Sequence, residues 1–193
     1  RAAEILVSTL INHGGDRVFC VPGESYLAVI DAMYDADTID VVTTRHEGGA
    51  SFMAVADAKM TGKPGVVLVS RGPGATNGSI GIHVSQQDAV PVIMFVGQVA
   101  REDLGRNAFQ ELDYTKTFSD MAKWVVEITE ADKVAEDVRR AFTIAQSGVP
   151  GPVIVSLPED MLIDQTEALP LSPATISQPK PDSEDIIKVC DML

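Results

Sequence analysis

Hydrophobic and polar positions follow two alternating patterns along the chain. Short runs of apolar, often β-branched residues are separated by stretches in which apolar residues recur at helical spacing. Continuous apolar strands that alternate with helices are typical of a parallel sheet buried on both faces. We therefore predict an α/β fold with a doubly wound, mostly parallel six-stranded sheet and helices on both faces. The predicted strands are 17–21, 40–44, 66–70, 91–97, 123–126 and 151–157.

The segments between these strands differ in how clearly they show helical spacing. Residues 98–120 lack a clear period, so we predict a long functional loop with short helical turns there. A glycine-rich turn at 72–78 leads into a helix that includes Ile80 and Ile82. The other predicted helices are 2–12, 26–34, 47–60 and 131–146.

The sequence changes character after residue 163. Residues 164–181 are proline-rich and polar, which favours an extended linker because proline disrupts helices and central strands. Residues 182–193 return to helical spacing, with Ser183 as the predicted N-cap and an apolar side formed by Ile186, Ile187 and Val189. We predict a domain over 1–163, then the linker, then the first helix of a middle domain that is absent from this chain.

Charge and composition limit the partners. Asp and Glu number 28 against 15 Lys and Arg, and the net charge of -13 disfavours a phosphate backbone, so no nucleic-acid partner is expected. We find no apolar run of bilayer length and no signal-peptide pattern, so we predict a soluble, cytoplasmic protein with no membrane partner. Cys20 and Cys190 give neither a disulfide framework nor a metal-ligand spacing, so no metal ligand is expected in this chain.

Four turns with chemically informative residues each follow a predicted strand. Because parallel strands place their carboxyl ends at the same edge of a sheet, we expect these turns to meet. The glycine-rich turn is not a nucleotide phosphate loop, because it lacks the lysine of that motif. The four turns are Pro22-Gly23, His46-Glu47, the run from Gly72 to Asn77, and the run from Phe109 to Glu111.

Glu47 is the leading catalytic candidate in these turns. It begins a helix directly after a strand, among glycine and apolar residues, and such a setting suits proton transfer by a carboxyl group. The alternative is that Glu47 only complements the helix dipole, which is a common role for an acidic residue in a first helical turn. We interpret His46 as a structural residue at the start of the helix, since nothing in the sequence makes it a metal ligand.

An ordered set of motifs extends over about residues 1–165. The motifs are VPG (21–23), RHEGGA (45–50), GKPGV (62–66), GPGATN (72–77), VPVIMFVGQV (90–99), AFQE (108–111) and GPVIVSLPED (151–160). Together they resemble the N-terminal, pyrimidine-binding domain of the thiamin-diphosphate-dependent enzyme superfamily that includes acetolactate synthase and benzoylformate decarboxylase. The resemblance is closest to acetolactate synthase-like enzymes.

This resemblance implies roles for individual residues. Glu47 matches the glutamate that hydrogen-bonds to N1′ of the cofactor's aminopyrimidine ring, where a carboxyl group relays a proton and an amide does not. The positions that match cofactor-binding residues are Val21, Gly23, Glu47, Pro73 and Asn77. The positions expected to face the substrate are Glu24, Phe109 and Gln110, and the structural alternatives for the last two are a packed loop anchor and a solvated amide.

The resemblance also implies an activity and an assembly. The family decarboxylates 2-oxo acids, and the acetolactate synthases transfer the acyl group to an acceptor, so we expect a thiamin-diphosphate-dependent transferase or lyase. The family binds the diphosphate and Mg²⁺ in a C-terminal domain with a GDG motif, which does not occur here. Since its active site forms between subunits, we expect a homodimer or homotetramer and an inactive isolated fragment. Binding of FAD by the absent middle domain stays open.

Several positions depart from the acetolactate synthase pattern. Arg71 stands where serine is usual, Glu24 replaces a glycine, and Ser70 occupies the position of a histidine in benzoylformate decarboxylase. No adjacent His-His pair occurs in 101–115, which disfavours a pyruvate decarboxylase. These departures leave decarboxylation without carboligation as an alternative. A flavodoxin-like module that binds a nucleotide or flavin is a second alternative, supported only by the alternation of strands and helices and by the glycine-rich turns. An inactive homologue that serves in assembly is a third.

Overall fold

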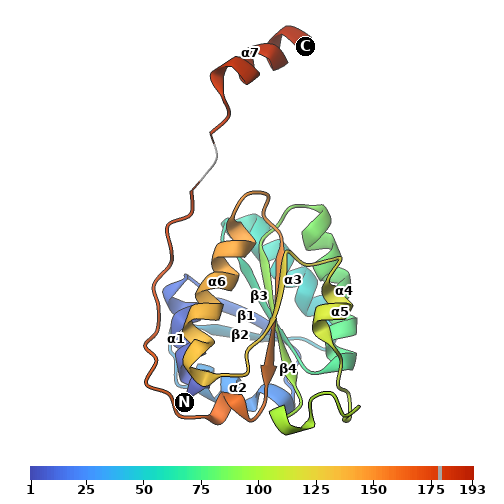
Figure 1. Cartoon of the computed structure of the whole chain (residues 1–193), viewed down its shortest axis with the longest axis vertical. Helices are drawn as coiled ribbons and strands as arrows, with labels where there is room; N and C mark the ends of the chain where they lie inside the picture. Colours follow the sequence, from blue (N-terminus) through green and yellow to red (C-terminus); the bar gives the residue numbers. More distant parts are fainter. Residues whose placement is uncertain (178–179) are drawn as a thin grey trace.

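The computed structural model describes residues 1–177 and 180–193. Its strands form one six-stranded sheet in the order β2-β1-β3-β4-β6-β5, and every neighbouring pair is parallel (Figure 1). The predicted α/β sheet is confirmed, and it is wholly rather than mostly parallel. The strands are β1 (Arg17–Cys20), β2 (Asp40–Thr43), β3 (Gly65–Val69), β4 (Val92–Gln98), β5 (Trp124–Glu127) and β6 (Pro152–Pro158).

Helices cover both faces of the sheet and bury a separate core on each. Consecutive residues of β3 alternate between the cores, with Val66 and Leu68 in one and Val67 and Val69 in the other, as the two-residue period of a strand requires. The first core also contains residues of α1 (Ala2–Asn12), α2 (Leu27–Tyr34) and α6 (Val134–Gln146). The second contains residues of α3 (Glu47–Thr61), α4 (Gly72–Gln87) and α5 (Tyr114–Phe118).

Short 3₁₀ turns refine the predicted helix boundaries. The segments predicted as helices at 26–34 and 131–146 begin with η1 (Glu24–Tyr26) and η3 (Ala131–Lys133). The loop after β4 contains η2 (Arg101–Asp103) and the single-turn α5, in line with the short helical turns predicted there. A further turn, η4 (Met161–Ile163), follows β6.

Helices α3 and α4 lie side by side at unusually close range. A Cβ atom built on Gly81 of α4 would lie 2.3 Å from Oγ of Ser51 on α3, so only glycine permits this approach. The left-handed backbone of Gly62, with φ of 72°, then ends α3. The close crossing brings the starts of α3 and α4 together at the carboxyl edge of the sheet.

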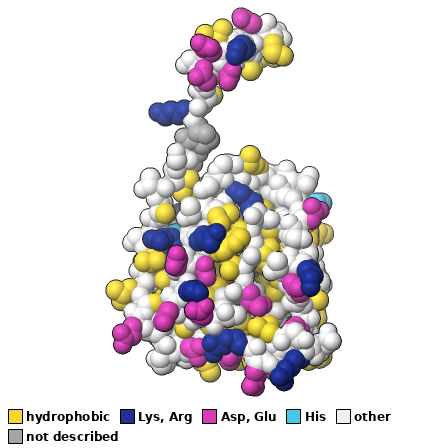
Figure 2. Space-filling view, in the orientation of Figure 1, with side chains coloured by type: hydrophobic (Ala, Val, Ile, Leu, Met, Phe, Trp, Pro, Cys, Tyr) yellow, Lys and Arg dark blue, Asp and Glu magenta, His cyan; other side chains and the backbone are white. Residues whose placement is uncertain are grey.

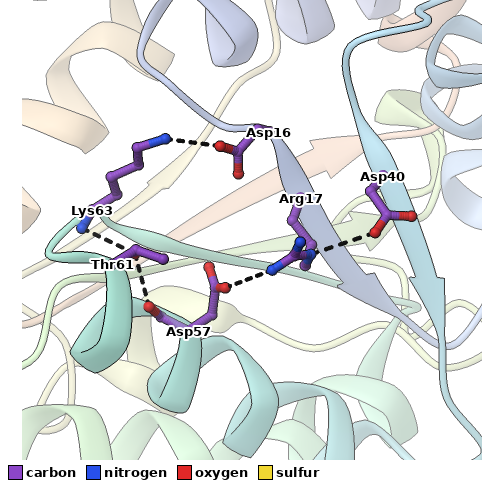
Figure 3. A network of polar contacts seen from close by, with 6 residues as sticks. All are labelled: Asp16, Arg17, Asp40, Asp57, Thr61 and Lys63. Carbon is purple, nitrogen blue, oxygen red and sulfur yellow. Dashed lines mark hydrogen bonds and ion pairs between the residues drawn. The ribbon is translucent and has the colours of Figure 1, made fainter.

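At the opposite, amino edge of the sheet, a polar network connects β1, β2 and α3 (Figure 3). Arg17 at the start of β1 pairs with Asp40 of β2 at 3.4 Å and with Asp57 of α3 at 3.0 Å. Lys63 pairs with Asp16 at 2.8 Å, and this contact lowers the pKa of the Asp16 carboxyl group. Because most of these side chains are solvent-exposed, the ion pairs contribute little to stability.

The C-terminal segment extends away from the sheet. Residues 164–177 contain no helix or strand and run along α1, where Nδ2 of Asn12 donates to the Leu171 carbonyl at 3.4 Å. Residues 178–179 of the predicted linker lie outside the described residues. Every residue of α7 (Ser183–Met192) is exposed, including those of its predicted apolar side. Figure 1 shows this helix at the C-terminal end of the chain.

The predicted N-cap of this last helix is wrong by one residue. Ser183 already belongs to the first helical turn, whereas Asp182 has an extended backbone and its carboxylate accepts the Glu184 N–H at 2.8 Å.

Acidic and basic side chains are interspersed over the face in Figure 2 rather than gathered into one patch of a single sign. None of the helices in the described ranges is long and apolar enough to cross a membrane.

Candidate functional site

The strand order places a topological switch point at the carboxyl ends of β1 and β3. The chain runs outward from β1 to β2 and then returns to place β3 on the other side of β1. The helix after β1, α2, packs on one face of the sheet, and the helix after β3, α4, packs on the other. Connections that leave in opposite directions open a crevice at such a switch point, where open α/β sheets bind their ligands.

The turn after β1 is fixed against the end of β3. A Cβ atom built on Gly23 would lie 2.7 Å from Cβ of Ser70, so glycine is required for this approach. The hydroxyl groups of Ser25 and Ser70 are hydrogen-bonded at 2.9 Å, and the Tyr26 hydroxyl donates to the Val21 carbonyl. Burial raises the pKa of Tyr26, which keeps its hydroxyl protonated as a donor.

The turn after β2 presents Glu47 as the first residue of α3. His46 is the N-cap: its backbone is extended and its Nδ1 accepts the Gly48 N–H at 3.0 Å. The His46 carbonyl accepts the Ala50 N–H at 3.1 Å, the first hydrogen bond of the helix. The Glu47 side chain is thus attached to a defined helix start and is only partly exposed.

Asn77 of α4 holds the Glu47 carboxylate from the neighbouring helix. Its Nδ2 donates to Oε2 of Glu47 at 2.9 Å. A Cβ atom built on Gly74 would lie 3.4 Å from Oε1 of Glu47, so the glycine-rich start of α4 leaves room beside the carboxylate. Among the described residues, no hydrogen bond is found to Oε1, and both Asn77 and Pro73 are exposed. One carboxylate oxygen is therefore held while the other is available to a ligand.

The loop after β4 is tied to the start of α4. The Gly72 N–H donates to the Gln110 carbonyl at 2.8 Å, and Gln110 has a left-handed backbone with φ of 65°. The Glu111 carboxylate accepts the backbone N–H groups of Gly105 and Ala108 at 2.5 and 3.0 Å. Phe109 between these contacts is 77% exposed, which disagrees with a packed-anchor role.

The four turns predicted to meet are joined through the glycine-rich turn. Ser70 and Gly72 contact the turns after β1 and β4, and Asn77 contacts the turn after β2. All the residues predicted to bind cofactor or substrate therefore come from turns that meet at one edge of the sheet.

An ion-pair cluster at the same edge includes one partner that the sequence did not predict. Nη2 of Arg71, whose side chain is only 10% exposed, lies 2.5 Å from Oε2 of Glu159, and Nη1 lies 3.8 Å from Oε1 of Glu24. Glu24 therefore faces Arg71 while its own side chain stays 75% exposed. The available signal for Glu159 was its position directly after β6, at the edge where the other turns were expected.

A cavity of about 250 Å³ lies behind the loop after β4. Its lining includes Gln98, Glu127 and Ser156. The Glu127 carboxylate accepts hydrogen bonds from Nε2 of Gln98 at 3.3 Å and from the Ser156 hydroxyl at 3.1 Å. None of the predicted cofactor-binding residues lines this cavity. Across residues 1–177 and 180–193, no group of three or more His, Cys, Asp or Glu side chains is arranged to hold a metal ion.

Comparison with protein families gives a match over most of the sheet. The family described as "Thiamine pyrophosphate enzyme, N-terminal TPP binding domain" matches residues 1–117. The matched segment runs from α1 through the loop after β4 and into α5, so it includes each turn that meets at the carboxyl edge.

Comparison with individual proteins gives acetolactate synthases. The chain is 41% identical over 160 residues to the acetolactate synthase isozyme 3 large subunit of Escherichia coli (strain K12), which is 83% of this chain and 28% of the relative. It is 36% identical over 187 residues to the acetolactate synthase of Bacillus subtilis (strain 168), covering 97% of this chain and 33% of the relative. It is 42% identical over 146 residues to the mitochondrial acetolactate synthase catalytic subunit of Saccharomyces cerevisiae, covering 76% and 21%. The chain thus spans between a fifth and a third of the length of these relatives.

Proposed function

Because this chain belongs to the family of thiamine pyrophosphate enzyme N-terminal TPP binding domains, we propose that its carboxyl edge binds the aminopyrimidine ring of thiamin diphosphate. The enzyme that contains it decarboxylates a 2-oxo acid and transfers the acyl group to an acceptor. The acetolactate synthases among its relatives support this reaction. The family match favours thiamin diphosphate over the nucleotide or flavin of a flavodoxin-like module.

The observation that carries the proposal is the arrangement of the Glu47 carboxylate. Asn77 fixes Oε2 at 2.9 Å, and the glycine at position 74 leaves room beside Oε1. An ionised carboxylate accepts hydrogen bonds, and a protonated carboxyl group donates one. A ring nitrogen that shares a proton therefore fits Oε1. The residues present therefore fit the pyrimidine end of the cofactor.

Each residue of the site has a distinct part in this proposal. Glu47 holds a proton at Oε1 and shares it with N1′ of the pyrimidine, and Asn77 keeps the carboxylate in the orientation this requires. Gly23 allows the backbone of the turn after β1 to approach the ring, together with Val21 and Pro73. When bound, thiamin diphosphate supplies the carbanion chemistry that lets a 2-oxo acid lose carbon dioxide.

The substrate end of the site is assigned to the loop after β4 and to Glu24. Phe109 is exposed beside the glycine-rich turn, where an apolar ring excludes water from a bound acyl group. Gln110 contacts that turn through its carbonyl, and its side chain is proposed to face the substrate with that of Glu24. We propose that these three positions select the acceptor.

The remaining parts of the active site are proposed to come from outside this chain. The diphosphate and Mg²⁺ are held by a C-terminal domain, and the domain of one subunit faces the pyrimidine domain of another in a homodimer or homotetramer. Partly exposed apolar side chains on the two helices of the site suit such a contact: Phe52 and Met53 on α3 and Ile80 on α4 are 43, 46 and 53% exposed.

We also propose the division into a domain over 1–163, a linker and the first helix of a middle domain.

The experiment is a titration of the full-length protein with thiamin diphosphate and Mg²⁺, followed by pyruvate turnover with and without a second 2-oxo acid. Carbon dioxide release together with a carboligated product is expected. Carbon dioxide release without that product leaves a decarboxylase. Cofactor binding without turnover leaves another acyl donor or an inactive assembly subunit. Saturable binding of a flavin or nucleotide with no affinity for thiamin diphosphate would overturn the proposal.

A further inference from the structure

The helix that begins with Glu47 has an unfavourable first turn. Gly48 and Gly49 follow Glu47 directly, and glycine is among the poorest helix formers because it loses the most backbone freedom on folding. A first turn of this composition depends on its N-cap to stay ordered. The usual N-caps are serine, threonine, aspartate and asparagine, whereas this helix has histidine.

The His46 ring acts as a hydrogen-bond acceptor in this position. The backbone is extended, with φ of -159° and ψ of 135°, and Nδ1 lies 3.0 Å from the Gly48 nitrogen. Since the Gly48 N–H is the donor, Nδ1 carries a lone pair and the ring proton is on Nε2. The His46 carbonyl also accepts a hydrogen bond from the Thr44 hydroxyl at 3.1 Å, which fixes the residue from the preceding strand end.

The absence of a side chain at Gly48 leaves room for the His46 ring. A Cβ atom built on Gly48 would lie 3.0 Å from Nδ1 of His46 and 3.4 Å from the Asn77 carbonyl oxygen. A Cβ atom at position 48 would therefore crowd the capping ring, while its contact with α4 would be an ordinary one. Gly49 differs, because nothing lies within 4 Å of a Cβ atom built there.

We propose that His46 is a positioning residue for Glu47, acting through Nδ1 as the N-cap of α3. The ring orders the first turn of the helix, and this order keeps the Glu47 carboxylate at hydrogen-bond distance from Asn77. The role in catalysis rests on the proposed function of Glu47, whereas the capping role does not. Loss of an N-cap acceptor changes the equilibrium between an ordered and a frayed first turn by roughly fivefold.

Three substitutions separate capping from the other roles of a histidine. His46→Asn places an amide oxygen at the position of Nδ1, so the cap is kept without an imidazole. His46→Gln places its amide oxygen at the position of Nε2, where it does not reach the Gly48 N–H. His46→Ala removes both acceptors.

Two readouts are measured on the full-length protein. The first is hydrogen exchange of the backbone amides of residues 46–52 without cofactor, followed by mass spectrometry. We expect exchange to be roughly fivefold faster in the alanine and glutamine variants, and within twofold of wild type in the asparagine variant. The second is steady-state kinetics at saturating cofactor, where kcat falls by a similar factor in the same two variants and KM for the 2-oxo acid stays within twofold.

The outcomes distinguish this inference from the proposed function. If the asparagine variant exchanges as fast as the alanine variant, or if the alanine variant exchanges like wild type, the capping role is refuted whatever the enzyme does. If His46→Gln keeps the wild-type kcat and His46→Asn does not, His46 acts through Nε2 and the inference is refuted. If exchange follows the expected pattern and no variant, wild type included, uses thiamin diphosphate, the proposed function fails and the cap stands.

Discussion

Asn77 on α4 donates a hydrogen bond from Nδ2 to Oε2 of Glu47 on α3, at 2.9 Å. The contact joins the starts of two helices that follow different strands of the sheet, β3 and β2. It exists because the two helices cross closely, with Gly81 against Ser51 further along. The position of the carboxylate is therefore a property of the packed pair of helices rather than of the turn after β2 alone.

Replacement of Asn77 by alanine tests this relationship. A hydrogen bond to a charged group contributes about 1.5–3 kcal/mol, and solvent exposure favours the lower value, so we expect kcat of the full-length enzyme to fall roughly tenfold. At about 2–4 °C per kcal/mol, loss of the same hydrogen bond should lower the melting temperature by no more than about 6 °C. Gln87→Ala, which removes an exposed amide at the far end of the same helix, should leave both quantities unchanged. Equal kcat for Asn77→Ala and wild type would show that Glu47 does not need this partner.

The close crossing of α3 and α4 predicts opposite effects for two glycine substitutions. Gly81→Ala would bring Cβ to within 2.3 Å of Ser51 Oγ, so we expect a loss of about 1–3 kcal/mol in the free energy of unfolding, despite the better helix propensity of alanine. Gly49→Ala has open space and should be neutral or stabilising by up to about 1 kcal/mol. Urea unfolding of both variants measures the difference. A Gly81→Ala variant as stable as wild type would mean that the helices separate without penalty.

His13 at the end of α1 predicts a dependence of stability on pH. Its Nδ1 donates to the Thr9 carbonyl at 2.7 Å, its ring packs on Phe142, and its buried Nε2 has no hydrogen-bond partner in the described part of the chain. Burial lowers the pKa of His13 below its unfolded value of about 6.5. The unfolded chain therefore takes up a proton first as the pH falls, so the stabilisation is complete above about pH 6.5 and is lost below it.

The measurement for His13 is the melting temperature of wild type and His13→Gln between pH 7.5 and pH 5.5. We expect the wild-type melting temperature to fall more steeply across this interval than that of the variant, which has no group titrating at this position. Parallel curves would show that the His13 proton equilibrium is the same in the folded and unfolded chain.

The isolated 193-residue chain is predicted to fold without binding its cofactor tightly. The described residues include the pyrimidine site proposed at Glu47 but no group of side chains arranged to hold a metal ion. Calorimetric titration of this chain with thiamin diphosphate and Mg²⁺ should therefore show at most weak binding, and pyruvate should not be consumed. Turnover by the isolated chain would contradict the assignment of the diphosphate and Mg²⁺ site to another domain.

Much of the fold follows from the sequence because its strands are buried on both faces. Continuous apolar runs such as Val66 to Val69 predict such strands directly, and the observed strand boundaries agree within one residue. The meeting of the four turns also followed from the sequence, since parallel strands end at a common edge. The turns were predicted to meet, but the contacts within them were not.

The features that were not predicted are of two kinds. One kind is a contact between residues that are far apart in the chain, and the other is the identity of the residue that caps a helix. Arg71 and Glu159 are 88 positions apart. The sequences of β3 and β6 do not indicate which acidic side chain pairs with the buried guanidinium of Arg71. Asp182 and Ser183 are both good N-caps, so composition alone did not decide between them. The capping role of His46 was missed because histidine is rarely found there and its acceptor nitrogen is evident only from geometry.

Exchange of the C2 proton of bound thiamin diphosphate with solvent tests most directly whether Glu47 moves a proton to the cofactor. The full-length protein is compared with its Glu47→Gln variant at saturating cofactor, since the amide keeps the size of the side chain and its contact with Asn77 but relays no proton. General acid–base catalysis contributes about 10²–10⁴-fold, so the variant should exchange at least about 100-fold more slowly while its cofactor stays bound and its melting temperature is unchanged. An exchange rate within about threefold of wild type, with the cofactor bound, would contradict the role assigned to Glu47.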